Sequence, residues 1–167
     1  MKKVIALLLI ALSLSSCEKD DICADGTTPN LIVEFFDIAN PANRKSVPNL
    51  KVRGIGALTD LGNFNGVSII ELPLDITIDT VKFSLIINST STSAVMPPNE
   101  DFLQFNYTRQ EFYVSRACGF NTFFELNSPD GVLLSNSLPT GISWIKAINI
   151  QTNSITTENE THIKILF

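Results

Sequence analysis

Apolar residues in this chain recur at every second position, and this period constrains the fold more than any other feature of the sequence. The alternation is clearest in residues 31–36 and 81–87. Successive side chains of a strand point to opposite faces, so this period predicts half-buried β-strands. Apolar residues at helical spacing are scarce, and no helix is predicted.

Further strands are expected over shorter apolar runs, which are separated by residues typical of turns. Pairs such as Asn40-Pro41 and Asn65-Gly66 favour turns. Residues 108–110 lie between two of the runs and predict the turn of a β-hairpin, although they include no glycine. The additional strands are expected at residues 50–53, 67–72, 102–107, 111–115, 120–126, 144–151 and 161–167.

The number of strands predicts the fold class. Eight or nine short strands without intervening helices favour two antiparallel sheets packed face to face, as in an Ig-like or transthyretin-like β-sandwich. A small β-barrel is the alternative. Hydrophobic residues make up 44% of the chain and charged residues 17%, so the chain can bury enough apolar surface to fold. The 11 phenylalanines are expected to fill the interior.

The first residues of the chain have the parts of a secretory leader. Two lysines precede an apolar run at residues 4–14, and small residues precede Cys17. The run is too short to span a bilayer comfortably. The residues before Cys17 resemble the sequence cut by lipoprotein signal peptidase, so residues 1–16 are expected to be removed and Cys17 to carry lipid. The alternative is an ordinary secreted protein cut after Ala11 or Ser16.

Acyl chains on Cys17 would hold the protein on a membrane without a transmembrane helix. Residues 17–29 are then the lipidated N-terminus and linker, and residues 30–167 are the β-sandwich domain. The segment Glu18-Lys19-Asp20-Asp21 resembles the export signal of Bacteroidetes surface lipoproteins, a lysine followed by two acidic residues. The expected location is the outer membrane. This signal favours the cell surface, and the periplasmic face is the alternative.

Two further cysteines, Cys23 and Cys118, would lie in an oxidising compartment and are expected to form a disulfide. Closing so long a loop would contribute roughly 4 kcal/mol in the chain-entropy model. The alternative is a catalytic thiol at Cys118, which needs a base such as histidine. The single histidine, His162, alternates with Ile163 and Ile165, so it is expected on the solvent-facing side of the last strand.

Charge and composition exclude several classes of function. The net charge is −5 and no run of lysine or arginine is present, so nucleic-acid binding is not expected. The glycines between residues 54 and 66 lack the lysine and the helix of a phosphate-binding loop. One histidine and two cysteines that are expected to be oxidised leave no His/Cys zinc site. No metal or cofactor is predicted.

Carboxylates are the remaining candidates for chemistry. Asp75 and Asp79 flank one short run, and Glu100 and Asp101 begin a predicted strand. Either pair offers oxygen ligands to calcium, but neither has the alternating acidic loop with glycine of a dedicated site. Solvated surface charge is therefore the expected role. A hydrolase acting on polysaccharide or peptide would need two such groups in one cleft.

The segment Asp79-Thr80-Val81 matches the three-residue pattern of O-glycosylation in Bacteroidetes envelope proteins. That pattern is an acidic residue, a hydroxyl residue and a small apolar residue. Thr80 is therefore a candidate for glycosylation.

Four stretches of the chain have a familiar order and spacing, namely residues 17–23, 28–37, 49–53 and 113–119. Together they resemble a Bacteroidetes lipoprotein family catalogued only as a domain of unknown function. The resemblance spans nearly the whole chain after the leader. It implies that Cys23 and Cys118 belong to the pattern of the family, which favours the disulfide. It implies no activity and no catalytic residue.

These patterns favour a non-enzymatic binding or structural module at the outer membrane, with a protein or a glycan as its partner. Loops at residues 54–66 and 88–101 are expected to carry the contacts, because a sandwich presents loops at its ends. One alternative is a small-molecule or metal carrier, which would need an apolar cavity. The other is the carboxylate-dependent hydrolase.

Overall fold

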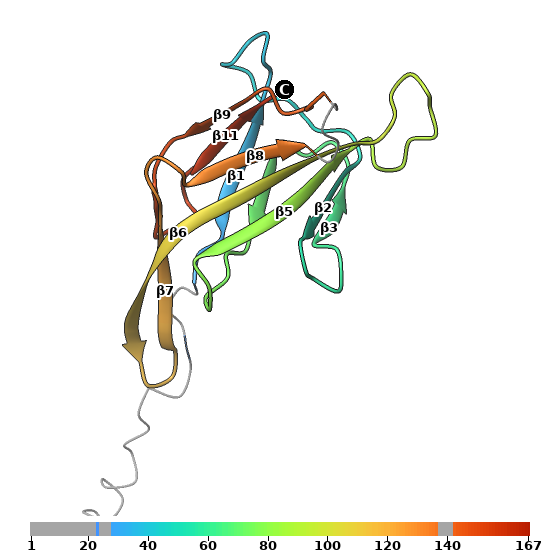
Figure 1. The fold of residues 1–167 in the computed structure, drawn as a ribbon. Coiled ribbons are helices and arrows are strands. Elements are labelled where there is room, and N and C mark those ends of the chain that lie inside the picture. The colour runs from blue at the N-terminus through green and yellow to red at the C-terminus, as the bar shows by residue number, and fades with distance from the viewer. Residues whose placement is uncertain (1–22, 24–27, 137–141) are drawn as a thin grey trace, which may run out of the picture.

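Figure 1 shows the computed structural model, which describes Cys23, residues 28–136 and residues 142–167. Within these ranges the chain forms eleven strands and no helix, so the all-β prediction is confirmed. The apolar pattern did not predict β3, β8 and β10. The strands are β1 (Leu31–Phe36), β2 (Leu50–Gly54), β3 (Gly62–Phe64), β4 (Ile69–Leu72), β5 (Thr80–Ile87), β6 (Asn99–Ser115), β7 (Gly119–Leu126), β8 (Val132–Asn136), β9 (Ala147–Ile150), β10 (Ser154–Ile155) and β11 (Ile163–Leu166).

The strands form two sheets that share one core. The smaller sheet has the order β4-β1-β11-β9, and the larger has the order β10-β7-β6-β5-β2-β3, with β8 also paired to β6. Buried side chains from both sheets belong to a single hydrophobic cluster. The sheets do not close into a barrel, so the sandwich prediction is confirmed and the barrel alternative is wrong. All strand pairs are antiparallel except β1 with β11, which run parallel.

Strand β1 is buried on both faces, although its alternation predicted burial on one face only. All six of its residues are buried, including the charged Glu34. Its outer face is covered by side chains from elsewhere in the chain. Arg44 forms an ion pair with Glu34, and the ammonium of Lys164 lies 4.8 Å from the centre of the Phe36 ring. These partners explain why a strand with polar and aromatic residues on its outer face is inaccessible to solvent.

Strand β6 is continuous through residues 108–110, so the predicted hairpin turn at these residues is wrong. Its first half pairs with β5 on one edge and with β8 on the other. Its second half, from Tyr107 to Ser115, pairs with β7. The hairpin turn lies instead between Ser115 and Gly119. Gly119 has a φ of 71°, a conformation that glycine adopts without steric cost.

Trp144 connects the two sheets through the core. Its ring centre lies 6.2 Å from that of Phe35 in β1 and 5.4 Å from that of Phe167. Its indole Nε1 donates a hydrogen bond of 3.2 Å to the backbone oxygen of Leu85 in the larger sheet. The indole thus fills space between the sheets and satisfies its polar group in the same position.

The phenylalanines do not all fill the interior as predicted. Phe35, Phe83, Phe105 and others are buried, but Phe112 and Phe120 are exposed on the β6–β7 hairpin. This hairpin runs beyond the end of the sandwich, where no second sheet is available to cover its side chains (Figure 1).

Asp101 is buried, although the sequence predicted solvated surface charge at this position. Its carboxyl group accepts hydrogen bonds from Asn136 Nδ2 at 3.0 Å, from Ser143 Oγ at 2.5 Å and from the backbone nitrogen of Ile145 at 2.9 Å. The three donors come from β8 and from the segment that carries Trp144. Asp101 therefore joins these pieces to the start of β6.

Replacement of Asp101 by alanine is expected to lower the free energy of unfolding by about 2–4 kcal/mol, because buried donors lose their acceptor. Urea denaturation of the purified domain measures this change. Asp130→Ala is the matched control, since Asp130 is exposed, and we expect it to change stability by no more than about 0.5 kcal/mol. Equal losses in the two variants would contradict this role of Asp101.

Candidate functional site

The second half of β6 and the whole of β7 form a two-stranded extension, which we call the hairpin arm and define as residues 107–126. The arm leaves the larger sheet at the end where β5 begins, because Thr80 pairs with Asn106 immediately before it. In Figure 1 its two strands run on well beyond the rest of the domain. It is the longest projection formed by the strands of the described residues.

A disulfide joins the tip of the hairpin arm to the N-terminal segment. Cys23 and Cys118 are bonded, with their Cα atoms 4.8 Å apart, as the sequence predicted. In β7, the backbone nitrogen of Thr122 donates a hydrogen bond of 3.0 Å to Thr28 Oγ1. The N-terminal segment is therefore fastened to the hairpin arm at two positions, the turn and β7. Because Cys118 is bonded to Cys23, it is not a catalytic thiol in this structure.

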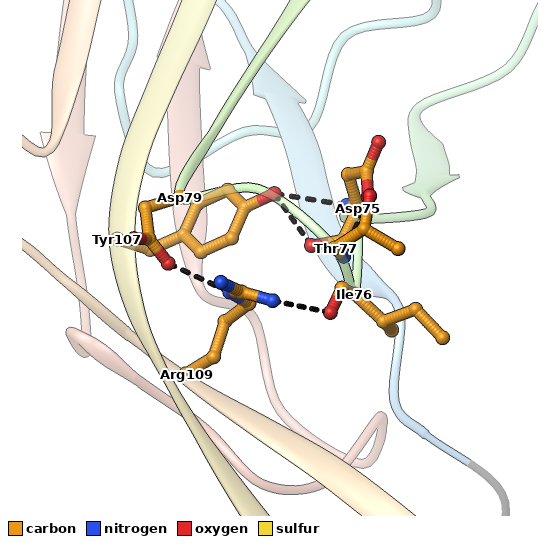
Figure 2. A network of polar contacts seen from close by, with 6 residues as sticks. All are labelled: Asp75, Ile76, Thr77, Asp79, Tyr107 and Arg109. Carbon is orange, nitrogen blue, oxygen red and sulfur yellow. Dashed lines mark hydrogen bonds and ion pairs between the residues drawn. The ribbon is translucent and has the colours of Figure 1, made fainter.

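Polar contacts hold the base of the arm to the loop at residues 73–79 (Figure 2). Arg109 Nε donates to Asp79 Oδ1 at 2.6 Å, and the same guanidinium also donates to the backbone oxygen of Ile76. The buried Tyr107 hydroxyl accepts from the backbone nitrogen of Asp75 at 2.9 Å and donates to its backbone oxygen at 3.0 Å. Tyr107 and Arg109 were not predicted as site residues, because Tyr107 was expected to end a strand and Arg109 to lie in a turn.

The pKa shifts in this network are those expected of groups that hold the structure together. Hydrogen bonds from the Thr77 side chain and backbone lower the pKa of Asp75, with Arg109 adding a smaller effect. Burial raises the pKa of Tyr107, and the ion pair with Asp79 raises the pKa of Arg109. Each shift favours the protonation state that the group already has near neutral pH.

The three carboxylates considered for hydrolysis have separate partners. Asp75 Oδ1 accepts from Thr77, Asp79 binds Arg109, and Asp101 is buried beside β8. In Figure 2 the carboxyl groups of Asp75 and Asp79 lie on opposite sides of the Tyr107 ring. Asp79 lines one surface cavity and Asp75 lines another, and neither of these two cavities is lined by both carboxylates.

Thr80 lies at the start of β5 and is exposed. Its hydroxyl donates a hydrogen bond of 2.9 Å to Asn106 Oδ1. Glycosylation at Thr80 stays a prediction. Cys17 and the leader at residues 1–16 lie outside the described residues.

The prediction that His162 faces solvent is wrong, because its side chain is wholly buried. Nδ1 accepts a hydrogen bond of 2.8 Å from the backbone nitrogen of Ile32, and Nε2 has no hydrogen-bond partner among the described residues. Burial lowers the pKa of His162, while Glu160, the backbone of Thr157 and Glu158 oppose this shift. A proton on Nδ1 would also break the bond from Ile32, so the imidazole is held neutral.

The two loops predicted to carry contacts lie at opposite ends of the larger sheet. Gly54, the last residue of β2, pairs with Phe83 near the start of β5, so residues 55–61 lie at that end. Residues 88–98 follow the last residue of β5 and lie at the other end. They therefore cannot form one contact surface.

Residues 55–61 instead share an end with the loop at residues 73–79 and with the base of the arm. The two loops line one open groove of about 480 Å³. Aliphatic side chains project from them into solvent. Leu58 is fully exposed, and Ile55, Ile76 and Ile78 are each at least half exposed. We call these two loops and their aliphatic side chains the apolar loop end.

The described residues contain no group of three or more His, Cys, Asp or Glu side chains that could hold a metal ion. Within the same residues, no helix is long and apolar enough to cross a membrane.

The fold and its attachments define an all-β protein with two packed sheets, a projecting hairpin and an N-terminal segment bonded to the hairpin tip. The chain belongs to a family of unknown function, DUF6452, whose model matches residues 49–167. The prediction of a family without a known function is thereby confirmed. The matched residues include Cys118 but begin after Cys23, and membership of a Bacteroidetes lipoprotein family stays a prediction. No curated protein and no solved structure matches the chain.

The buried His162 predicts how stability depends on pH. Its pKa is lowered from 6.5 in the folded state, so the unfolded chain binds a proton more readily. The free energy of unfolding is therefore expected to fall as pH decreases from 7 through about 6.5 toward 5. The aspartates with lowered pKa, Asp37 and Asp75, titrate below this range.

His162→Asn is the matched variant, because an amide oxygen can accept the bond from Ile32 but does not titrate. Urea denaturation at several pH values compares it with the wild type. The variant is expected to show a smaller loss of stability between pH 7 and pH 5. Parallel pH profiles for the two proteins would show that His162 does not cause the dependence.

Proposed function

We propose that this protein is a lipid-anchored envelope protein whose β-sandwich binds a partner protein through its apolar loop end. The observation that carries the proposal is the cluster of exposed aliphatic side chains on residues 55–61 and 73–79. Ile55 lines the groove, and Leu58, Ile76 and Ile78 lie on the same two loops. Single exposed apolar residues are common on soluble proteins, but several on two loops that line one groove are typical of an interaction surface.

The chemistry of the surface favours a protein over a glycan. The projecting side chains are leucine and isoleucine, which pack against other apolar side chains. Aromatic residues are absent from residues 55–61 and 73–79, and these loops thus lack the flat rings on which sugars stack. The groove is open to solvent, which suits a protein surface more than a small molecule that needs to be enclosed.

The position of the disulfide supports anchoring. Cys17 would carry the lipid, and Cys23, only six residues later, is bonded to the arm tip. A lipid on Cys17 would therefore hold the tip of the arm at the membrane. The apolar loop end lies at the base of the same arm, so the length of the arm would separate it from the membrane.

The arrangement gives less support to the hydrolase. Asp75 and Asp101 accept hydrogen bonds that hold the fold, and Asp79 holds Arg109. A hydrolytic site needs carboxylates that are available to a substrate. The binding role uses side chains that project into solvent.

The partner surface is tested by photocrosslinking in intact cells. A benzophenone amino acid in place of Leu58 is expected to form a specific adduct with a protein, because this side chain points fully into solvent. The same substitution at Val95, which is 89% exposed at the opposite end of the sheet, is the control and is expected to form none. Introduction of Ile76→Asp beside the Leu58 probe is expected to abolish the adduct. Equal adducts from both probe positions, or none from Leu58, would refute the proposed surface.

The location is tested by treating intact cells with a protease. The acidic segment after Cys17 favours the cell surface, so the native protein is expected to be degraded while a periplasmic control survives. Survival in intact cells, followed by cleavage after lysis, would place the domain on the periplasmic face instead.

A further inference from the structure

The tip of the hairpin arm carries aromatic side chains that the domain does not cover. Tyr113 is 59% exposed, Phe120 is 63% exposed and Phe112 is 45% exposed. The rings of Tyr113 and Phe120 pair across the two strands with their centres 5.4 Å apart. The rings of Phe112 and Phe123 form a second pair at 4.9 Å. Four aromatic residues therefore lie within one short stretch of hairpin.

These two pairs lie on opposite faces of the arm. Tyr113 and Phe120 are directly opposed in the strand register, so they share one face. Phe112 precedes Tyr113 and opposes Asn121, which places it on the other face. Both faces of the tip thus carry aromatic rings. A flat protein surface would cover only one of them, whereas a medium into which the tip is inserted would contact both.

The strands and turn that form the tip carry little charge of their own. Between residues 110 and 123 the only charged side chains are Glu111 and Arg116. Their charges cancel, so binding of the tip to a surface would depend on burial of the rings and not on attraction to charged groups. Aromatic rings with this environment are typical of the boundary between lipid headgroups and acyl chains.

The length of the tether limits where the tip can lie. Cys17 and Cys23 are six residues apart, so a fully extended tether spans about 20 Å. Cys23 is bonded to Cys118 in the turn of the arm. A lipid on Cys17 would therefore confine the aromatic tip to within that distance of the membrane.

We infer that the tip of the hairpin arm, with Tyr113, Phe120 and Phe112, inserts into the interface of the lipid bilayer that holds the lipidated Cys17. This inference rests on the proposed lipid anchor and adds a second, protein-borne contact with the same leaflet. The lipid supplies attachment, and the rings fix the orientation of the arm on the membrane.

The test uses the native lipidated protein in phosphatidylcholine vesicles whose acyl chains carry bromine, which quenches tryptophan fluorescence on contact. Phe120→Trp places a reporter at the tip, and Tyr113→Trp is a second reporter in case the first variant folds poorly. Val95→Trp is the matched control at the far end of the sheet. The buried Trp144 is present in all variants. Its fluorescence is measured in the wild-type protein and subtracted.

We expect the tip reporter to be quenched roughly twofold or more relative to the Val95→Trp control, because the ring would lie at the depth of aromatic membrane anchors. Equal quenching of both reporters in vesicle-bound protein would overturn the inference. A blue shift of the tip reporter without quenching would also overturn it, since it would indicate a second copy of the protein over the rings.

The intact mass of the purified protein separates this inference from the proposed anchor. A mass that includes acyl chains on Cys17, together with equal quenching, refutes the insertion of the tip but leaves the anchor intact. A mass without acyl chains refutes the anchor, and the inference that rests on it fails as well.

Discussion

The continuous hydrogen-bond ladder of β6 is the constraint on which the rest of the structure depends. Its first half is bonded on both edges, by β5 and β8, and is therefore a central strand of the larger sheet. Its second half is bonded to β7 and forms one side of the hairpin arm. A single strand thus belongs to both the core and the projection. Because no turn or linker intervenes, the orientation of the arm is set by the sandwich.

Most of the strands and the disulfide could be predicted from the sequence, because period-two alternation and cysteine pairing are local or countable signals. The short strands β3, β8 and β10 lack the alternation and could not be predicted. The burial of Glu34, Asp101 and His162 could not. Alternation shows which face a side chain takes, but it does not show whether that face is covered. Arg44 covers the outer face of β1, and Asn136, Ser143 and Ile145 donate hydrogen bonds to Asp101. These partners are distant in sequence, so only the fold brings them together.

The candidate site was predictable only in part, for a related reason. The loop at residues 54–66 was predicted as a contact region. The neighbouring loop at residues 73–79 was considered only as a source of carboxylates for catalysis or calcium binding. The fold brings these two loops together around one groove. It also places Asp75 against Tyr107 and Asp79 against Arg109, at the base of the arm. The turn of the arm was also misplaced. Residues 108–110 lie between two apolar runs, whereas the true signal is Gly119 directly after Cys118.

The disulfide at the arm tip also determines how mechanical force would pass through the protein. Tension applied to the N-terminal tail reaches Cys118 through Cys23 before it reaches β1. The force then acts along β6 and β7, whose hydrogen bonds to neighbouring strands lie perpendicular to it and share the load in shear. Strand β1 would bear little of the tension while the disulfide is intact. Reduction of the bond would redirect the same pull onto β1, an inner strand of the smaller sheet.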